Sequence, residues 1–244
     1  MTHLDTEAWI NIDRGELRDE CSILASEGGL LVAVGDSLSG RNEAARIVTL
    51  FFQAAGLRTH RVLDAGDQPS TLRYLLNDIV RWARIEAGGE DAGLSLAASN
   101  ASISDHKLFT YCVDALRPLM GMRPPKFAII VTSIGQNSPP NSSDLVHLRR
   151  LWESAGGCWV AIGDDSTAWR NLSERKVGLR RFTRQDLANI VREIVLEKGG
   201  NLDRIPSYLD KFFGPPANEI IPIIAYAQIQ RLVLAPVQDY NDLL

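Results

Sequence analysis

The sequence has few of the features that mark specialised classes of protein. Three cysteines in 244 residues, none in a Cys-x-x-Cys pair, exclude a disulfide scaffold. No apolar run approaches the roughly 20 residues that a membrane span requires. No block of basic charge occurs either, and 26 Lys and Arg against 30 Asp and Glu give a net charge of -4. Because nucleic-acid-binding domains usually carry a basic face, we expect neither nucleic acid nor membrane as a partner.

The cysteines and the N-terminal segment point to an ordinary intracellular chain. Cys21, Cys112 and Cys158 lie far apart in segments of apolar periodicity, which is typical of buried free thiols. The first 20 residues carry charges throughout and contain no apolar segment of a secretory signal. We therefore expect a cytoplasmic protein, with no metal site and no cofactor.

Strands and amphipathic helices alternate from residue 30 to residue 197. Continuous apolar runs predict strands buried on both faces of a parallel sheet at 30–34, 127–131 and 158–162. Shorter strands are expected at 59–63, 94–98 and 177–182, and helices at 14–27, 43–55, 71–87, 107–120, 144–155, 185–197 and 220–234. Because parallel strands need crossovers, this order predicts a three-layer α/β/α fold with a doubly wound, mostly parallel sheet and a helical C-terminal extension.

Three units are expected along the chain. Residues 1–29 form an N-terminal helical segment, residues 30–198 the α/β sheet domain, and residues 199–244 the C-terminal helical extension. The extension is too short to hold a core of its own. We expect it to pack across the sheet domain or onto another subunit, in a homo-oligomer or a larger assembly.

Two loops that follow predicted strands have the composition of an anion site. Residues 35–42 and 132–138 are rich in Gly, Ser and Asn, and in an open α/β sheet ligands bind beyond the carboxyl ends of the strands. The same residue types also cap helices, which is the simpler interpretation of either loop alone. If the two strands are neighbours, both loops face one phosphate. The candidate ligand-binding residues are Ser37, Ser39, Ser133, Asn137 and Ser138.

These segments resemble a known family. The run from Leu30 to Arg58 contains Gly35-x-Ser37-x-Ser39 and then Ala44-Ala45, and it resembles the first strand, loop and helix of sugar isomerase (SIS) domains. Residues 127–170 are similar to a later part of that domain. In the tail, Ile221-Pro222, Tyr226 and Gln230 resemble the C-terminal helix of glucosamine-6-phosphate synthase-type isomerases.

The resemblance implies a phosphosugar-binding protein. If the chain is an enzyme, the implied reaction is aldose–ketose isomerisation of a sugar phosphate, in which a base moves a proton between adjacent carbons. Glu219 and Glu43 are the candidates for that base. The resemblance implies a phosphosugar as the small-molecule partner.

Three alternatives stay open at the level of sequence. Gly35-Asp36-Ser37-Leu38-Ser39 is also similar to the start of SGNH (GDSL) hydrolases, which would make Ser37 the nucleophile of an esterase, but no histidine follows the last strand to activate it. The same segment resembles von Willebrand factor A domains, in which Ser37 and Ser39 would be metal ligands, but Gly35 or Asp36 and Ile134 fill the acidic positions, so that a protein-binding scaffold without the metal is expected. A third interpretation is a non-enzymatic interaction subunit whose site is degenerate.

Overall fold

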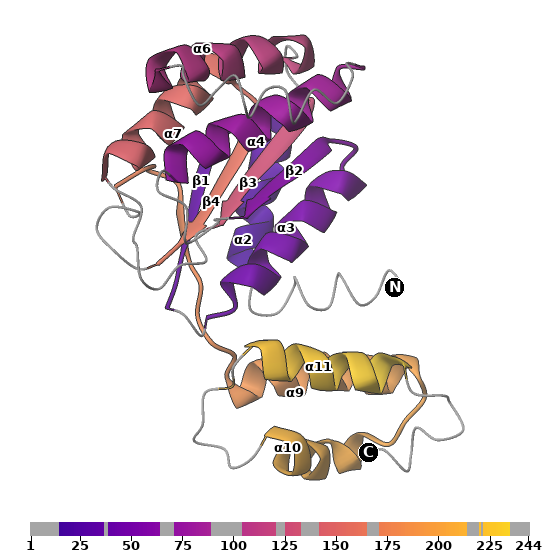
Figure 1. Ribbon diagram of the computed structural model, residues 1–244. Helices are drawn as coiled ribbons and strands as arrows, with labels where there is room; N and C mark the ends of the chain where they lie inside the picture. The colour runs from indigo at the N-terminus through magenta and orange to yellow at the C-terminus, as the bar shows by residue number, and fades with distance from the viewer. Residues whose placement is uncertain are drawn as a thin grey trace.

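The computed structural model has an α/β core and a smaller group of C-terminal helices (Figure 1). It describes residues 15–36, 39–63, 71–88, 104–120, 125–132, 142–164, 171–213, 220 and 222–234. The strands are β1 (Gly29–Val34), β2 (Arg58–Leu63), β3 (Phe127–Thr132), β4 (Cys158–Gly163) and β5 (Lys176–Gly178). The helices are α2 (Gly15–Glu27), α3 (Arg41–Ala54), α4 (Thr71–Glu86), α6 (Asp105–Leu116), α7 (Ser142–Ala155), α9 (Arg184–Glu197), α10 (Ile205–Phe213) and α11 (Pro222–Leu234), with short 3-10 turns at η1 (Arg117–Leu119) and η2 (Leu202–Arg204).

The five strands form one parallel sheet in the order β2-β3-β4-β1-β5. This confirms the predicted three-layer, doubly wound α/β fold. The chain leaves β1 through α3 on one face and returns from β2 to β4 through α4 and α7 on the other face. The winding therefore reverses between β1 and β4, which is where ligands bind in open sheets of this kind.

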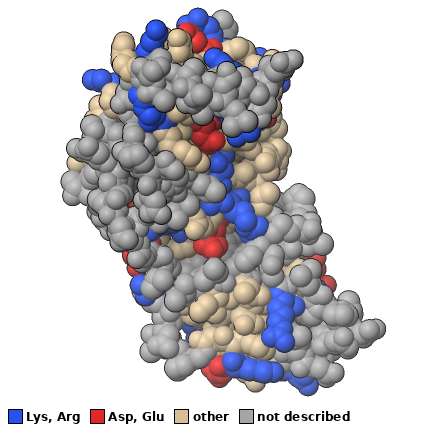
Figure 2. Space-filling model, in the orientation of Figure 1, with Lys and Arg blue, Asp and Glu red and all other residues tan. Residues whose placement is uncertain are grey.

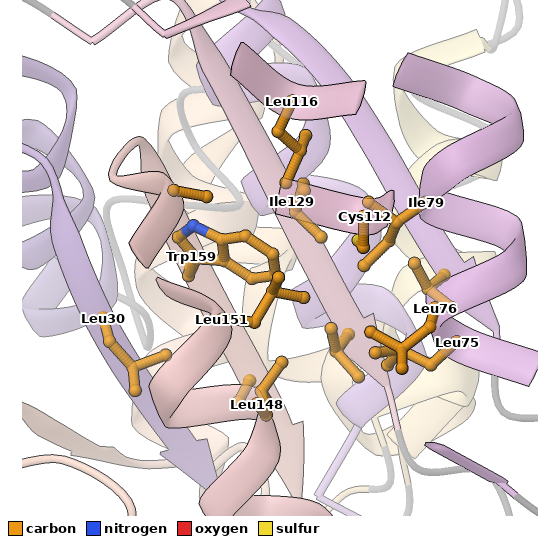
Figure 3. Close-up of a cluster of buried hydrophobic side chains, with 14 of the residues drawn as sticks. Leu30, Leu75, Leu76, Ile79, Cys112, Leu116, Ile129, Leu148, Leu151 and Trp159 are labelled. Carbon is orange, nitrogen blue, oxygen red and sulfur yellow. The ribbon is translucent and has the colours of Figure 1, made fainter. Parts of the chain in front are cut away.

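Alternate residues of the central strands enter two different cores. On one face, side chains of β1, β3 and β4 such as Leu30, Ile129 and Trp159 pack against α4, α6 and α7, as Figure 3 shows. On the other face, neighbours such as Leu31, Ile130 and Val160 pack against α2 and α3. Because successive side chains of a strand point to opposite faces, strands covered on both faces are apolar throughout.

The last strand, expected at 177–182 from its apolar residues, is shorter in the structure. It ends at Gly178, although the Leu179 N–H still donates to the carbonyl of Val34. Farther on, Phe182 pairs in antiparallel fashion with Ile220 and enters the core of the C-terminal helices. The strand expected at 94–98 lies outside the described residues.

The C-terminal helices share a core of their own. The buried side chains of α9, α10 and α11 pack together, and Ile47 of α3 joins them. Thr183 begins α9 with a capping box, in which its hydroxyl accepts from the Asp186 N–H and its own N–H donates to the Asp186 carboxylate. The expected boundaries at 29–30 and 198–199 stay predictions. No helix of the described chain is long and apolar enough to cross a membrane.

The three cysteines are free and buried, as predicted. The Cys158 thiol donates to the carbonyl of Leu24 at 2.9 Å. Burial raises the pKa of Cys158 to about 12, and burial raises the pKa values of Cys21 and Cys112 as well.

Because the thiolate is the reactive form, we expect the folded protein to resist an aromatic disulfide reagent at about pH 8. All three thiols become reactive when the chain is denatured. The measurement is the absorbance of released aromatic thiol with and without denaturant. Rapid labelling of any cysteine in the folded chain would contradict this burial.

Gly157 gives a second test of the fold. It has φ +81°, and a Cβ at this position would lie 2.5 Å from the ring of Phe127. We expect Gly157→Ala to lower the free energy of unfolding by about 2–4 kcal/mol, since backbone strain and overpacking add. The matched control is Gly156→Ala, which has φ +63° and open space around the new Cβ, with an expected loss of about 1 kcal/mol. Equal losses in urea denaturation would show that the contact with Phe127 does not matter.

Candidate functional site

The loop after β1 begins at the reversal point of the sheet. The Gly35 N–H donates to the carbonyl of Gly163 at the end of β4, and on the other side the Leu179 N–H donates to the carbonyl of Val34. The end of β1 is therefore held between the ends of β4 and β5. A ligand at this edge would meet groups from all three strands.

Within the loop, Ser39 is held against Asp36. The N–H and the hydroxyl of Ser39 both donate to the carbonyl of Asp36, at 3.2 and 2.8 Å. Ser39 is 1% exposed. A Cβ on Gly35 would lie 2.2 Å from the Ser39 hydroxyl and 2.6 Å from the Leu179 carbonyl. Only glycine therefore fits where the loop leaves the strand.

The loop ends directly at the N-terminus of α3. Gly40 is the N-cap residue and has φ 76° and ψ 42°, the left-handed conformation that glycine adopts without strain. It has no side chain with which to cap the helix. The first intrahelical bond runs from the Ala44 N–H to the Gly40 carbonyl, so the N–H groups of the preceding three residues lie at the positive end of the helix dipole.

Basic side chains flank this loop on the side of β5. A surface hollow of about 650 Å³ extends from Gly35 and Ser39 to Lys176, Arg180 and Arg181. Arg181 Nη2 donates to the Asp36 carboxylate at 3.0 Å, and Arg180 lies 3.5 Å from the Asp186 carboxylate. On the face of the molecule shown in Figure 2, Lys and Arg atoms gather near the middle, next to acidic atoms and above the C-terminal helices.

A further arginine approaches the loop from β2. Arg61 Nη2 donates to Oδ1 of Asn42, the second residue of α3, at 3.1 Å. The Nε of Arg61 is buried and has no hydrogen-bond partner in the described part of the chain. Burial lowers the pKa of Arg61, while Glu43 raises it and Arg46 lowers it. The guanidinium stays protonated at neutral pH, so the cluster of Arg61, Arg46 and Glu43 carries more positive than negative charge.

The sequence-predicted site residues fall into three groups. Ser39 lies in the loop, but its hydroxyl is buried and donates to Asp36. Glu43 is in the first turn of α3, and its charge acts on Arg61. Five other predicted residues lie outside the described residues: Ser37, Ser133, Asn137, Ser138 and Glu219.

The condition set for two loops to face one phosphate is not met, although residues 133–138 lie outside the described residues and their place stays a prediction. It required β1 and β3 to be neighbours, but β4 lies between them. Two strand spacings of roughly 4.8 Å place the ends of β1 and β3 about 10 Å apart. The apolar pattern of a strand does not encode its neighbours, and sequence reasoning could not decide this point.

Sequence reasoning missed the spacing of the glycines in this loop. Gly35 and Gly40 are separated by four residues and followed by Arg41 and Asn42, between a buried strand and a helix. Gly-x4-Gly-Lys-Ser/Thr in that context is the phosphate-binding P-loop, whose backbone N–H groups surround phosphates. Here arginine stands at the lysine position and asparagine at the hydroxyl position. The contact from Arg61 carried no signal in the sequence.

Comparison with solved structures finds similar chains at low identity. A Signal Transduction ATPase with Numerous Domains (STAND) from Pyrococcus horikoshii is 14% identical over 89% of this chain and 32% of that one, with a TM-score of 0.44. A RuvB variant from Thermotoga maritima is 12% identical over 91% and 62%, with a TM-score of 0.44. Drosophila ORC bound to DNA is 12% identical over 98% and 59%, with a TM-score of 0.47.

No protein-family model and no curated protein matches the sequence. The chain spans about a third of the STAND protein and about three fifths of the RuvB and ORC chains.

These comparisons correct the expected family. The chain is similar to a STAND ATPase, RuvB and ORC, so its assignment to sugar isomerase domains is wrong, as are the resemblances to SGNH hydrolases and von Willebrand factor A domains. The phosphosugar-binding or isomerase function is wrong with it. The alternatives of an esterase using Ser37 and of a non-enzymatic interaction subunit are not supported either. Short strand–loop–helix segments misled because they recur in many α/β folds.

The expected partners are corrected too. The phosphosugar partner was implied only by the sugar isomerase resemblance, so it is wrong as well. Excluding nucleic acid on net charge was also wrong, since one of the similar chains, Drosophila ORC, is bound to DNA. A net charge of -4 is a sum over the whole chain. It does not report where positive charges gather, and here they gather beside the loop after β1.

The buried hydroxyl of Ser39 generates a testable prediction. We expect Ser39→Ala to lower the free energy of unfolding by about 1–3 kcal/mol, because the Asp36 carbonyl loses a buried donor. The control is Ser22→Ala, whose exposed hydroxyl donates to Arg18 within α2 and whose loss should cost less than about 0.5 kcal/mol. Urea denaturation measures both, and an unchanged midpoint for Ser39→Ala would mean that this turn does not depend on the hydroxyl.

Proposed function

We propose that this protein binds a nucleoside polyphosphate through the loop from Gly35 to Asn42. The observation that carries the proposal is the geometry of this loop. It leaves a buried parallel strand at the reversal point, passes two glycines at P-loop spacing, and enters α3 at an N-cap without a side chain. This is the arrangement by which backbone N–H groups hold phosphates.

Charge supports the same proposal. Arg41 stands at the position of the P-loop lysine, and a guanidinium binds phosphate with two parallel hydrogen bonds. Arg180 and Arg181 approach from the end of β5, across the hollow from the loop. Positive charge from the segment after β5 and from Arg41, together with the dipole of α3, thus acts on this edge of the sheet.

The size of the hollow fits such a ligand. Pockets for small molecules usually measure about 300–1,000 Å³, and this one measures about 650 Å³. Arg181 is now paired with Asp36, so a phosphate that binds there exchanges one anion for another. That exchange leaves the arginine partnered in both states, and the Asp36 carboxylate that it releases is 54% exposed and open to water.

Binding is tested by thermal unfolding and calorimetry with ATP, ADP and inorganic tripolyphosphate. A ligand at 100 times its Kd should stabilise the fold by about 2.7 kcal/mol. A hexose phosphate, which offers one phosphate group, should bind much more weakly. The absence of any shift or heat with all three polyphosphates would refute the proposal.

A variant pair locates the site. We expect Arg41→Met to weaken polyphosphate binding about tenfold, the effect of losing one charge-assisted contact. The control is Arg149→Met, which removes an exposed arginine paired with Glu153 on α7, on the opposite face of the sheet. Equal affinities of the two variants would place the ligand elsewhere.

A further inference from the structure

A P-loop ordinarily works with Mg²⁺, and the residues at the two ligand positions here do not fit that ion. These positions are the loop Ser or Thr and an Asp at the end of another strand of the sheet. Asp164 follows β4 and leaves a carboxylate at this edge, but not at either of those positions. In this chain the first position is Asn42. β3 ends at Thr132, which is 1% exposed and whose hydroxyl donates to the carbonyl of Val62. Within the described residues, no group of three His, Cys, Asp or Glu side chains could hold a metal ion.

The oxygen of Asn42 is already used. Oδ1 accepts a hydrogen bond from Arg61 Nη2 at 3.1 Å, which aims a fixed positive charge at the atom that would otherwise ligate a cation. The same guanidinium keeps its buried Nε–H without a partner in the described chain. A donor of this kind beside the first turn of α3 is matched by an anion rather than by a metal.

The charges around Asn42 point in the same direction. Arg46 and Glu43 both act on Arg61. The guanidinium groups of Arg61 and Arg46 therefore stand against the one carboxylate of Glu43. A divalent cation would be repelled by this group, whereas the four negative charges of free ATP would be attracted by it.

We propose that Arg61, held against Asn42, takes the place of the divalent cation, so that the loop binds metal-free nucleoside polyphosphate. This inference rests on the proposed function and adds that the polyphosphate binds without a divalent cation. Arg61 stabilises the charge that Mg²⁺ neutralises in other P-loops. Magnesium in solution then lowers the affinity or leaves it unchanged, because it competes for the same phosphate oxygens.

The experiment measures the Kd of ATP for the full chain by calorimetry in excess Mg²⁺ and in excess EDTA. We expect the Kd in EDTA to be equal to or lower than the Kd in Mg²⁺. A Kd that rises tenfold or more in EDTA would overturn the inference while leaving the proposed function intact. Failure of ATP, ADP and tripolyphosphate to bind in either condition would instead overturn the proposed function itself.

Variants identify the residues responsible. Arg61→Met should weaken ATP binding roughly tenfold in EDTA and less in Mg²⁺. The double variant Arg61→Met with Asn42→Thr removes the guanidinium and restores a hydroxyl at the P-loop position. It should bind ATP more tightly with Mg²⁺ than without. The control is Arg58→Met at the opposite end of β2, whose side chain contacts Glu86. If Arg61→Met and Arg58→Met retain equal affinity in EDTA, Arg61 has no such role.

Circular dichroism of each variant reports whether it folds. If Arg61→Met fails to fold, the comparison of EDTA with Mg²⁺ on the unmodified chain decides the inference alone.

Discussion

The position of β1 between β4 and β5 is the constraint on which the site depends. Main-chain hydrogen bonds to Gly163 and from Leu179 hold the end of β1 on both sides. The space left for the departing chain admits no Cβ at Gly35. The start of the loop is therefore fixed by main-chain contacts rather than by long side chains.

Local charge matters more at this edge than the charge of the whole chain. Arginines from the segment after β5 line the hollow beside the loop and Arg61 of β2 contacts Asn42, although the chain as a whole is mildly acidic. Asp36 and Asn42 each engage one of these arginines through an oxygen atom. Both contacts pre-position a guanidinium, which reduces the side-chain entropy that an anion would otherwise have to remove on binding.

Much of the architecture could be predicted from hydrophobic residues that recur with a period of two in strands and 3.6 in helices. The apolar runs at 30–34, 127–131 and 158–162 became β1, β3 and β4 within a residue at each end. Helix α10 was missed because it has only nine residues, with Pro206 near its start and its buried residues spaced over two turns. Of the candidate site, the loop at 35–42 was singled out from its composition, but its glycine spacing was not recognised, and the second loop was expected beside it although β4 separates the two strands.

The sequence by itself determined which segments are strands and helices, that both faces of the sheet are covered, and that the cysteines are buried, because each of these follows from local periodicity and hydrophobicity. Only the tertiary structure decided that β4 separates β1 from β3 and that Arg61 meets Asn42 across 19 positions of sequence. Strand order and contacts between distant side chains depend on the packing of the whole chain. No short window of residues contains that information.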